Sequence, residues 1–116
     1  EVTRIFFQVG IAYGSDTGRA LGLIREAAVE NPAVLEEPPP LVTFESFGDN
    51  SLNLALRCYV SAIGDRLNTR TDLHLAIDRK MREAGITIAF PQRDVHLDTT
   101  RPLDVRMVDR QKGGPA

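Results

Sequence analysis

Apolar residues recur at three- and four-residue intervals in two stretches of the chain, which predicts two amphipathic helices. The first follows Gly14-Ser15-Asp16-Thr17, a turn that also supplies a helix N-cap, and it ends at Asn31-Pro32 because the residue before proline is pushed out of the helical region. The second spans Asp65 to Ala84 and ends at Gly85. The apolar positions are Leu21, Ile24 and Ala28 in the first helix and Leu73, Ala76, Ile77, Met81 and Ala84 in the second.

Other stretches are rich in β-branched and aromatic residues and predict strands at 5–13, 41–47 and 52–63. Gly48-Asp49-Asn50-Ser51 joins the second and third strands, and turn residues of this kind predict a hairpin. The third strand alternates, with Leu52, Leu54, Leu56, Cys58 and Val60 on one face. A further strand is expected through Val95 and Leu97.

The expected order is therefore strand, helix, strand, strand, helix, strand. With right-handed crossovers this order predicts an α+β, ferredoxin-like βαββαβ sandwich, in which two helices cover one face of a four-stranded antiparallel sheet. Glu36-Glu37-Pro38-Pro39-Pro40 is interpreted as a stiff spacer before the second strand, with a proline-rich recognition motif as the alternative.

The composition favours a single domain in water. The chain has 116 residues, 42% of them hydrophobic and 26% charged, and no apolar run approaches the roughly 18 residues of a membrane-spanning helix. We expect no secretory leader. The net charge of -2, from 14 basic and 16 acidic residues, argues against a nucleic-acid partner.

Candidate chemistry is sparse. Cys58 is the single cysteine and lies in an apolar run, which indicates a small buried side chain. His74 and His96 are the two histidines, and Asp94 shares a strand face with His96, but a metal site usually needs three or more converging ligands. Ser15 is explained by helix capping. We therefore expect no catalytic residues, no metal and no cofactor, and retain a ferredoxin-like small-molecule-sensing regulatory domain as the alternative function.

Three segments together resemble the cytoplasmic C-terminal domain of the small-conductance mechanosensitive channel family. They are VGIAYGSD at 9–16, FGDNSLNLALRCYV at 47–60 and AGITIAFPQRDVHL at 84–97. Each segment alone is weak evidence for the family, but the occurrence of all three in this order is specific. The resemblance implies a non-enzymatic domain of a cytoplasmic vestibule, or cage, on the inner face of the cell membrane. In such a channel, tension opens a pore through which ions and osmolytes leave.

The resemblance also implies partners and a domain organisation. The partners would be the chain's own copies, in a homoheptamer, and a transmembrane pore domain of the same polypeptide. Residues 1–8 would be a remnant of a preceding β domain or a linker, 9–98 the ferredoxin-like domain, and 99–116 an extension with a strand and then a disordered tail. Phe6 and Phe7 would then be exposed.

The expected subunit interface lies late in the chain. Phe90, Pro91 and Gln92 are interpreted as a structural corner that also contacts other subunits, because proline at a strand start cannot donate to the ladder. Relatives implied by the resemblance form a barrel from the segment that follows, and the alternating apolar residues available for it here are Val95, Leu97, Leu103, Val105 and Met107. Closing identical edge strands into a ring would remove unpaired backbone groups.

Overall fold

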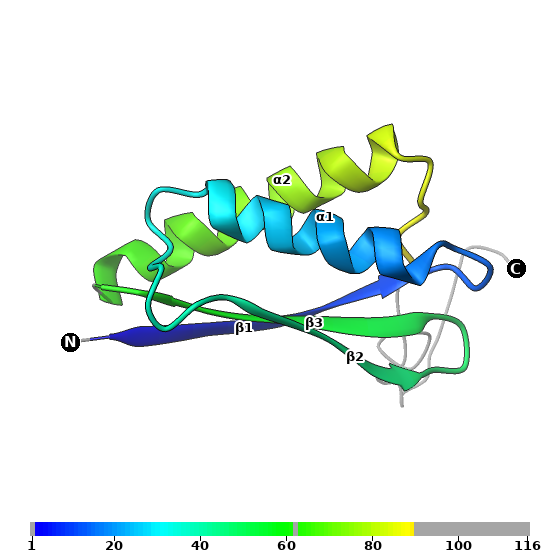
Figure 1. Ribbon diagram of the computed structural model, residues 1–116, viewed down its shortest axis with the longest axis horizontal. Coiled ribbons are helices and arrows are strands. Elements are labelled where there is room, and N and C mark those ends of the chain that lie inside the picture. The colour runs from blue at the N-terminus through cyan, green and yellow to red at the C-terminus, as the bar shows by residue number, and fades with distance from the viewer. Residues whose placement is uncertain (1, 62, 90–116) are drawn as a thin grey trace, which may run out of the picture.

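The computed structural model describes residues 2–61 and 63–89, which form a sheet with helices on one side (Figure 1). The elements are β1 (Thr3–Ile11), α1 (Thr17–Glu30), β2 (Leu41–Phe47), β3 (Leu52–Val60), the 3-10 turn η1 (Ile63–Asp65) and α2 (Arg66–Glu83). The described sheet has three strands in the order β1-β3-β2, all antiparallel. Helices α1 and α2 lie together over the same face of the sheet. The opposite face is called the open face below.

The central strand β3 is the one whose alternation was clearest in the sequence. All of its predicted inward residues are buried beneath the helices, and its pairing with β1 runs without a break from Thr3↔Val60 to Ile11↔Leu52. The open face of β3 also has a buried position. Ala55 is covered there between its cross-strand neighbours Gln8 and Thr43.

Helix α1 begins and ends where the sequence predicted. The carboxylate of Asp16 accepts a hydrogen bond from the Arg19 backbone N–H at 3.1 Å, so Asp16 is the N-cap. We had expected helix capping to explain Ser15, and this expectation is wrong. The Ser15 hydroxyl instead donates to the Ala12 carbonyl at 2.6 Å and closes the preceding turn. Asn31 is the C-cap, and α1 buries Ala20, Leu23, Ile24, Ala27 and Ala28 against the sheet.

Helix α2 presents a narrower apolar face. Thr69, Leu73, Ile77 and Met81 are buried, while Ala76 and Ala84 pack at its margin. Gly85 follows the helix with a φ of 76°, a left-handed conformation that glycine adopts without strain.

The N-terminal strand differs from the prediction. It begins at Thr3, so residues 3–8 belong to the sheet, and it ends at Ile11, which leaves Tyr13 exposed beyond it. Phe7 is 4% exposed and lies in the core, so the expectation that it would be exposed is wrong. Phe6 points to the open face and is 37% exposed. The origin of residues 1–8 in a preceding domain or linker stays a prediction.

Of the predicted fourth strand, the structure describes only the segment that leads to it. After Gly85 the chain returns to β1 on the side away from β3, where Ile88 forms an antiparallel bridge with Ile11. The predicted strand through Val95 and Leu97 lies outside the described residues. The four-stranded sheet and the complete ferredoxin-like topology therefore stay predictions.

Candidate functional site: the outer edge of β1 and the groove beneath α2

The predicted interface residues all lie outside the described residues. They are Phe90, Pro91, Gln92, Val95, Leu97, Leu103, Val105 and Met107, and Asp94 and His96 lie outside them as well. The structure therefore brings none of them together. It does show where the chain leaves the described domain, which is the outer edge of β1, the edge that faces away from β3.

Two backbone hydrogen bonds hold residues 87–89 to this outer edge. The N–H of Ala12 donates to the Thr87 carbonyl at 2.9 Å, and the N–H of Ala89 donates to the Gly10 carbonyl at 2.8 Å. Gly10 has no side chain where the two backbones meet, and a Cβ placed there would lie 2.5 Å from the Ala89 carbonyl oxygen. The glycine pair of the first motif therefore serves close approach and a turn, with Gly14 at a φ of 90°.

Farther along the same edge, a side chain takes the place of a strand. The guanidinium of Arg70, on α2, donates to the Phe6 carbonyl at 2.9 Å and lies 5.3 Å above the Phe7 ring. The ring of His74 stacks on Phe7 with centroids 4.2 Å apart, and its Nδ1 lies 2.8 Å from the Arg70 carbonyl. His74 is thus held by packing.

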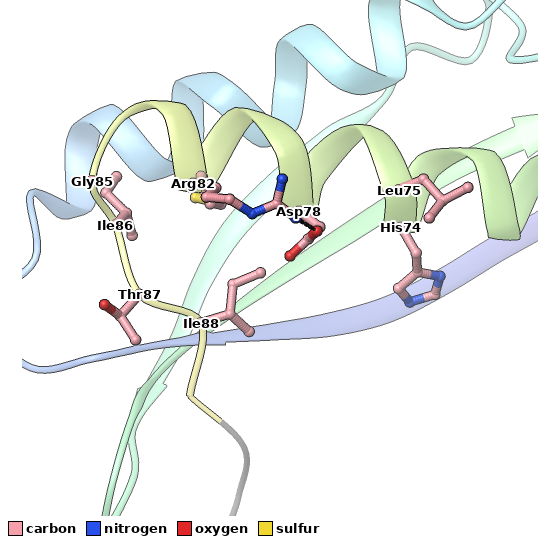
Figure 2. Close-up of a pocket in the computed structure, with 9 residues that line it drawn as sticks. His74, Leu75, Asp78, Arg82, Gly85, Ile86, Thr87 and Ile88 are labelled. Atoms are coloured by element: carbon pink, nitrogen blue, oxygen red, sulfur yellow. Dashed lines mark hydrogen bonds and ion pairs between the residues drawn. The ribbon is translucent and has the colours of Figure 1, made fainter.

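A groove of about 660 Å³ opens between α2 and the segment 85–88 (Figure 2). This α2 groove is lined by His74, Leu75, Asp78, Met81, Arg82, Gly85, Ile86, Thr87 and Ile88. Its floor is apolar, and the ion pair between Asp78 and Arg82 lies at its rim. The sequence reasoning did not single out this groove, although the alternating Ile86 and Ile88 were a usable signal for an apolar edge.

The open face carries a polar network. The Arg57 guanidinium lies 4.8 Å above the Phe6 ring, donates to the Thr43 hydroxyl at 3.1 Å and pairs with Glu45 at 3.4 Å. The hydrogen bond from Thr43, followed by that from Arg57, lowers the pKa of Glu45. These are cross-strand contacts of the kind that stabilise sheets.

The described residues offer little for covalent chemistry. Within residues 2–61 and 63–89, no group of three or more His, Cys, Asp or Glu side chains is placed to hold a metal ion. Burial raises the pKa of Cys58 to about 11, so the thiol stays protonated at neutral pH and is a poor nucleophile. In the same residues no helix has the length and apolarity needed to cross a bilayer.

Comparison with known proteins identifies the family. The family model described as "Mechanosensitive ion channel MscS, C-terminal" matches residues 5–88. The chain belongs to the MscS family. The match begins in β1 and ends at the bridge between Ile88 and Ile11, so it covers the described domain almost completely.

Individual relatives support the MscS family assignment. The mechanosensitive channel MscK of Escherichia coli strain K12 is 40% identical over 112 residues, which are 97% of this chain and 10% of that protein. An uncharacterized MscS family protein of Haemophilus influenzae is 41% identical over 96 residues, or 83% of this chain and 9% of that protein. The chain thus spans about a tenth of the length of these relatives.

A solved structure shows the same fold. The closed-state crystal structure of Helicobacter pylori MscS matches with a TM-score of 0.72 and 23% identity, covering 85% of this chain and 39% of that chain. The arrangement of sheet and helices seen in Figure 1 is therefore an MscS-type C-terminal fold.

Proposed function

We propose that this domain forms part of the cytoplasmic vestibule of a mechanosensitive channel at the inner membrane. Tension would open the pore, and ions and osmolytes would pass through the vestibule. The observation that carries the proposal is the 40% identity to the channel MscK over nearly the whole chain. The family match over residues 5–88 supports it independently.

The role we propose is assembly and filtering, without catalysis. The relatives named for a function are channels. Cys58 is buried with a raised pKa, and His74 is held by packing on Phe7, so these two candidate groups have structural roles in the described domain.

The proposed partners are further copies of the chain, in a homoheptamer, and the pore domain of the same polypeptide. The corner at Phe90, Pro91 and Gln92 and the alternating residues Val95, Leu97, Leu103, Val105 and Met107 would supply contacts between copies. This part of the proposal rests on the alternation and on the outer edge of β1, where the described chain ends.

A domain exchange tests the proposed function. The segment of Escherichia coli MscK that aligns with this chain is replaced by residues 1–116 and expressed in cells that lack mechanosensitive channels. We expect survival of hypo-osmotic shock and tension-activated currents in membrane patches. A matched chimera with Leu54→Asp, at a fully buried position of β3, should lose both.

The result is decisive only for chimeras that reach the membrane, which immunoblotting of membrane fractions verifies. An exchange chimera present at the level of MscK but as silent as the Leu54→Asp chimera would contradict the proposal.

A small-molecule-sensing domain is the second candidate. A volume of about 660 Å³ for the α2 groove lies in the range of small-molecule sites, and this role requires the groove to be free of the chain's own side chains. Soluble metabolites that raise the Tm of the chain, and that lose this effect in a Leu75→Arg variant, would support sensing.

A further inference from the structure

The structure assigns an occupant to the α2 groove: we propose that the side chain of Phe90 from the same chain docks in it. Residue 89 is the last that the structure describes here, and the groove is formed by the segment that leads directly to it. The inference goes beyond the proposed function, because it concerns the packing of one chain and holds whether or not the domain belongs to a channel.

The pairing at the outer edge of β1 fixes which way residue 90 points. Ile88 bridges Ile11, which is fully buried, and Figure 2 shows the Ile88 side chain directed toward α2. Side chains alternate along an extended chain, so residue 90 faces the same side as Ile88. Proline at 91 adds to this argument, because the residue before a proline is restricted to extended conformations.

The same register shows where pairing with β1 becomes weaker. Ala12 and Gly10 turn their backbone groups toward residues 87–89, so the next residue of β1 to do so is Gln8. In this register its partner is residue 91, and proline has no N–H to donate. The ladder therefore loses one hydrogen bond at Pro91, which weakens pairing with β1 directly after Phe90.

The residues beyond Pro91 lie past the α2 groove in this register. If the register continued, Gln92 and Asp94 would lie opposite Phe7 and Ile5, past the α2 groove and close to Arg70. Phe90 is apolar and is the first residue beyond Ala89 on this side of the chain, so it is the side chain that docks in the groove.

Docking of Phe90 would anchor the C-terminal extension to the domain at one point. Whatever residues 92–116 contact, they would start from a fixed position beside Gly10 and α2. An empty groove would instead allow that starting point to move.

Nuclear Overhauser effects on the wild-type chain test the proposal without any variant. With Phe labelled on the ring and Ile and Leu labelled on the methyl groups, we expect effects between Phe90 and both Leu75 and Ile88. Mixing differently labelled chains separates contacts within one chain from contacts between copies. Effects seen only between copies, or absent for Phe90, would overturn the proposal.

A double-mutant cycle measured by thermal unfolding gives a second test. Leu75 and Leu67 are both exposed on α2, at 64% and 71%, and only Leu75 lines the α2 groove. We expect Phe90→Ala to lower the Tm by about 5–10 °C, whereas Phe47→Ala, at a ring that is 76% exposed, should lower it by less than about 3 °C.

The coupling between positions identifies the groove. Introduced into the wild-type chain, Leu75→Ala should lower the Tm at least twice as much as it does when introduced into the Phe90→Ala variant. The reason is that Phe90, the proposed contact of Leu75, is already absent from that variant. Leu67→Ala should have the same effect in both backgrounds. Equal behaviour of Leu75→Ala and Leu67→Ala in the cycle would overturn the docking of Phe90.

Discussion

Gly10 is the residue at which the end of the described domain meets β1. A methyl group there would lie 2.5 Å from the Ala89 carbonyl oxygen, which is backbone and has little freedom to move. We therefore expect Gly10→Ala to lower the free energy of unfolding by about 1–3 kcal/mol. Urea unfolding followed by circular dichroism measures the change.

Gly22 provides the matched control, because nothing lies within 4 Å of a Cβ built on it in helix α1. An alanine at this exposed helical position should raise the free energy of unfolding by about 0.5–1 kcal/mol. Changes of the same sign for Gly10→Ala and Gly22→Ala would contradict the close approach at Gly10.

Lys80 joins the two helices through carboxylates of α1. Its ammonium lies 3.1 Å from Glu30 and 3.3 Å from Glu26, and the hydrogen bond with Glu30, with help from Glu26, raises the pKa of Lys80. Because the folded-state pKa is the higher one, this stabilisation is complete below the unfolded-state pKa of about 10.4 and is lost as pH rises through the folded-state pKa.

The free energy of unfolding should consequently fall more steeply above about pH 10 for the wild-type chain than for Lys80→Met. Urea titrations between neutral and alkaline pH measure both slopes. Parallel slopes for the two proteins throughout the alkaline range would show that the ion pairs do not couple to folding.

At the scale of elements, β1 is an edge strand of the described sheet, and α2 covers part of its outer edge. In the described part of the chain its outer edge meets only residues 87–89 and the Arg70 guanidinium on the Phe6 carbonyl. Unpaired strand edges invite pairing with other chains. We expect Arg70→Ala to free this carbonyl and to increase self-association, measured by sedimentation velocity over a range of protein concentrations.

Arg79→Ala is the control for this edge, because Arg79 lies exposed on the same helix and the change in net charge is identical. Its sedimentation should match that of the wild-type chain. If Arg70→Ala and Arg79→Ala sediment alike, capping of the edge by Arg70 is not what limits association.

The elements differ in how far the sequence predicted them, and the reasons are physical. Strand β3 was predicted well because it is central, so one face must be buried along its whole length. The start of β1 was missed, because the placement of Phe7 under Arg70 and His74 depends on α2, far away in sequence. The α2 groove is formed by neighbouring parts of the chain, but it was missed because it depends on how residues 85–88 fold back onto β1.

At the scale of the whole molecule, several large apolar side chains of the described domain are exposed. Leu67 and Leu75 lie on α2, while Phe44 and Phe47 stack edge to face on β2, at the edge of the described sheet opposite β1. Contiguous exposed apolar patches mark sites where proteins contact partners, whereas single exposed apolar side chains are common on any protein surface. The predicted interface residues could not be checked against these surfaces, because they lie outside the described residues.

Self-assembly through the C-terminal extension is the prediction that belongs to the whole molecule. If Val95, Leu97, Leu103, Val105 and Met107 close a ring of strands between copies, the full chain should form a species larger than the monomer. A chain cut after Arg93 should stay monomeric at the same concentration, because it retains the sheet, both helices and Phe90 but none of these residues. Analytical ultracentrifugation distinguishes the two. A full-length Leu97→Asp, Val105→Asp variant separates loss of the apolar residues from loss of chain length, and it should also be monomeric. The same sedimentation profile for all three proteins would remove the extension from the interface.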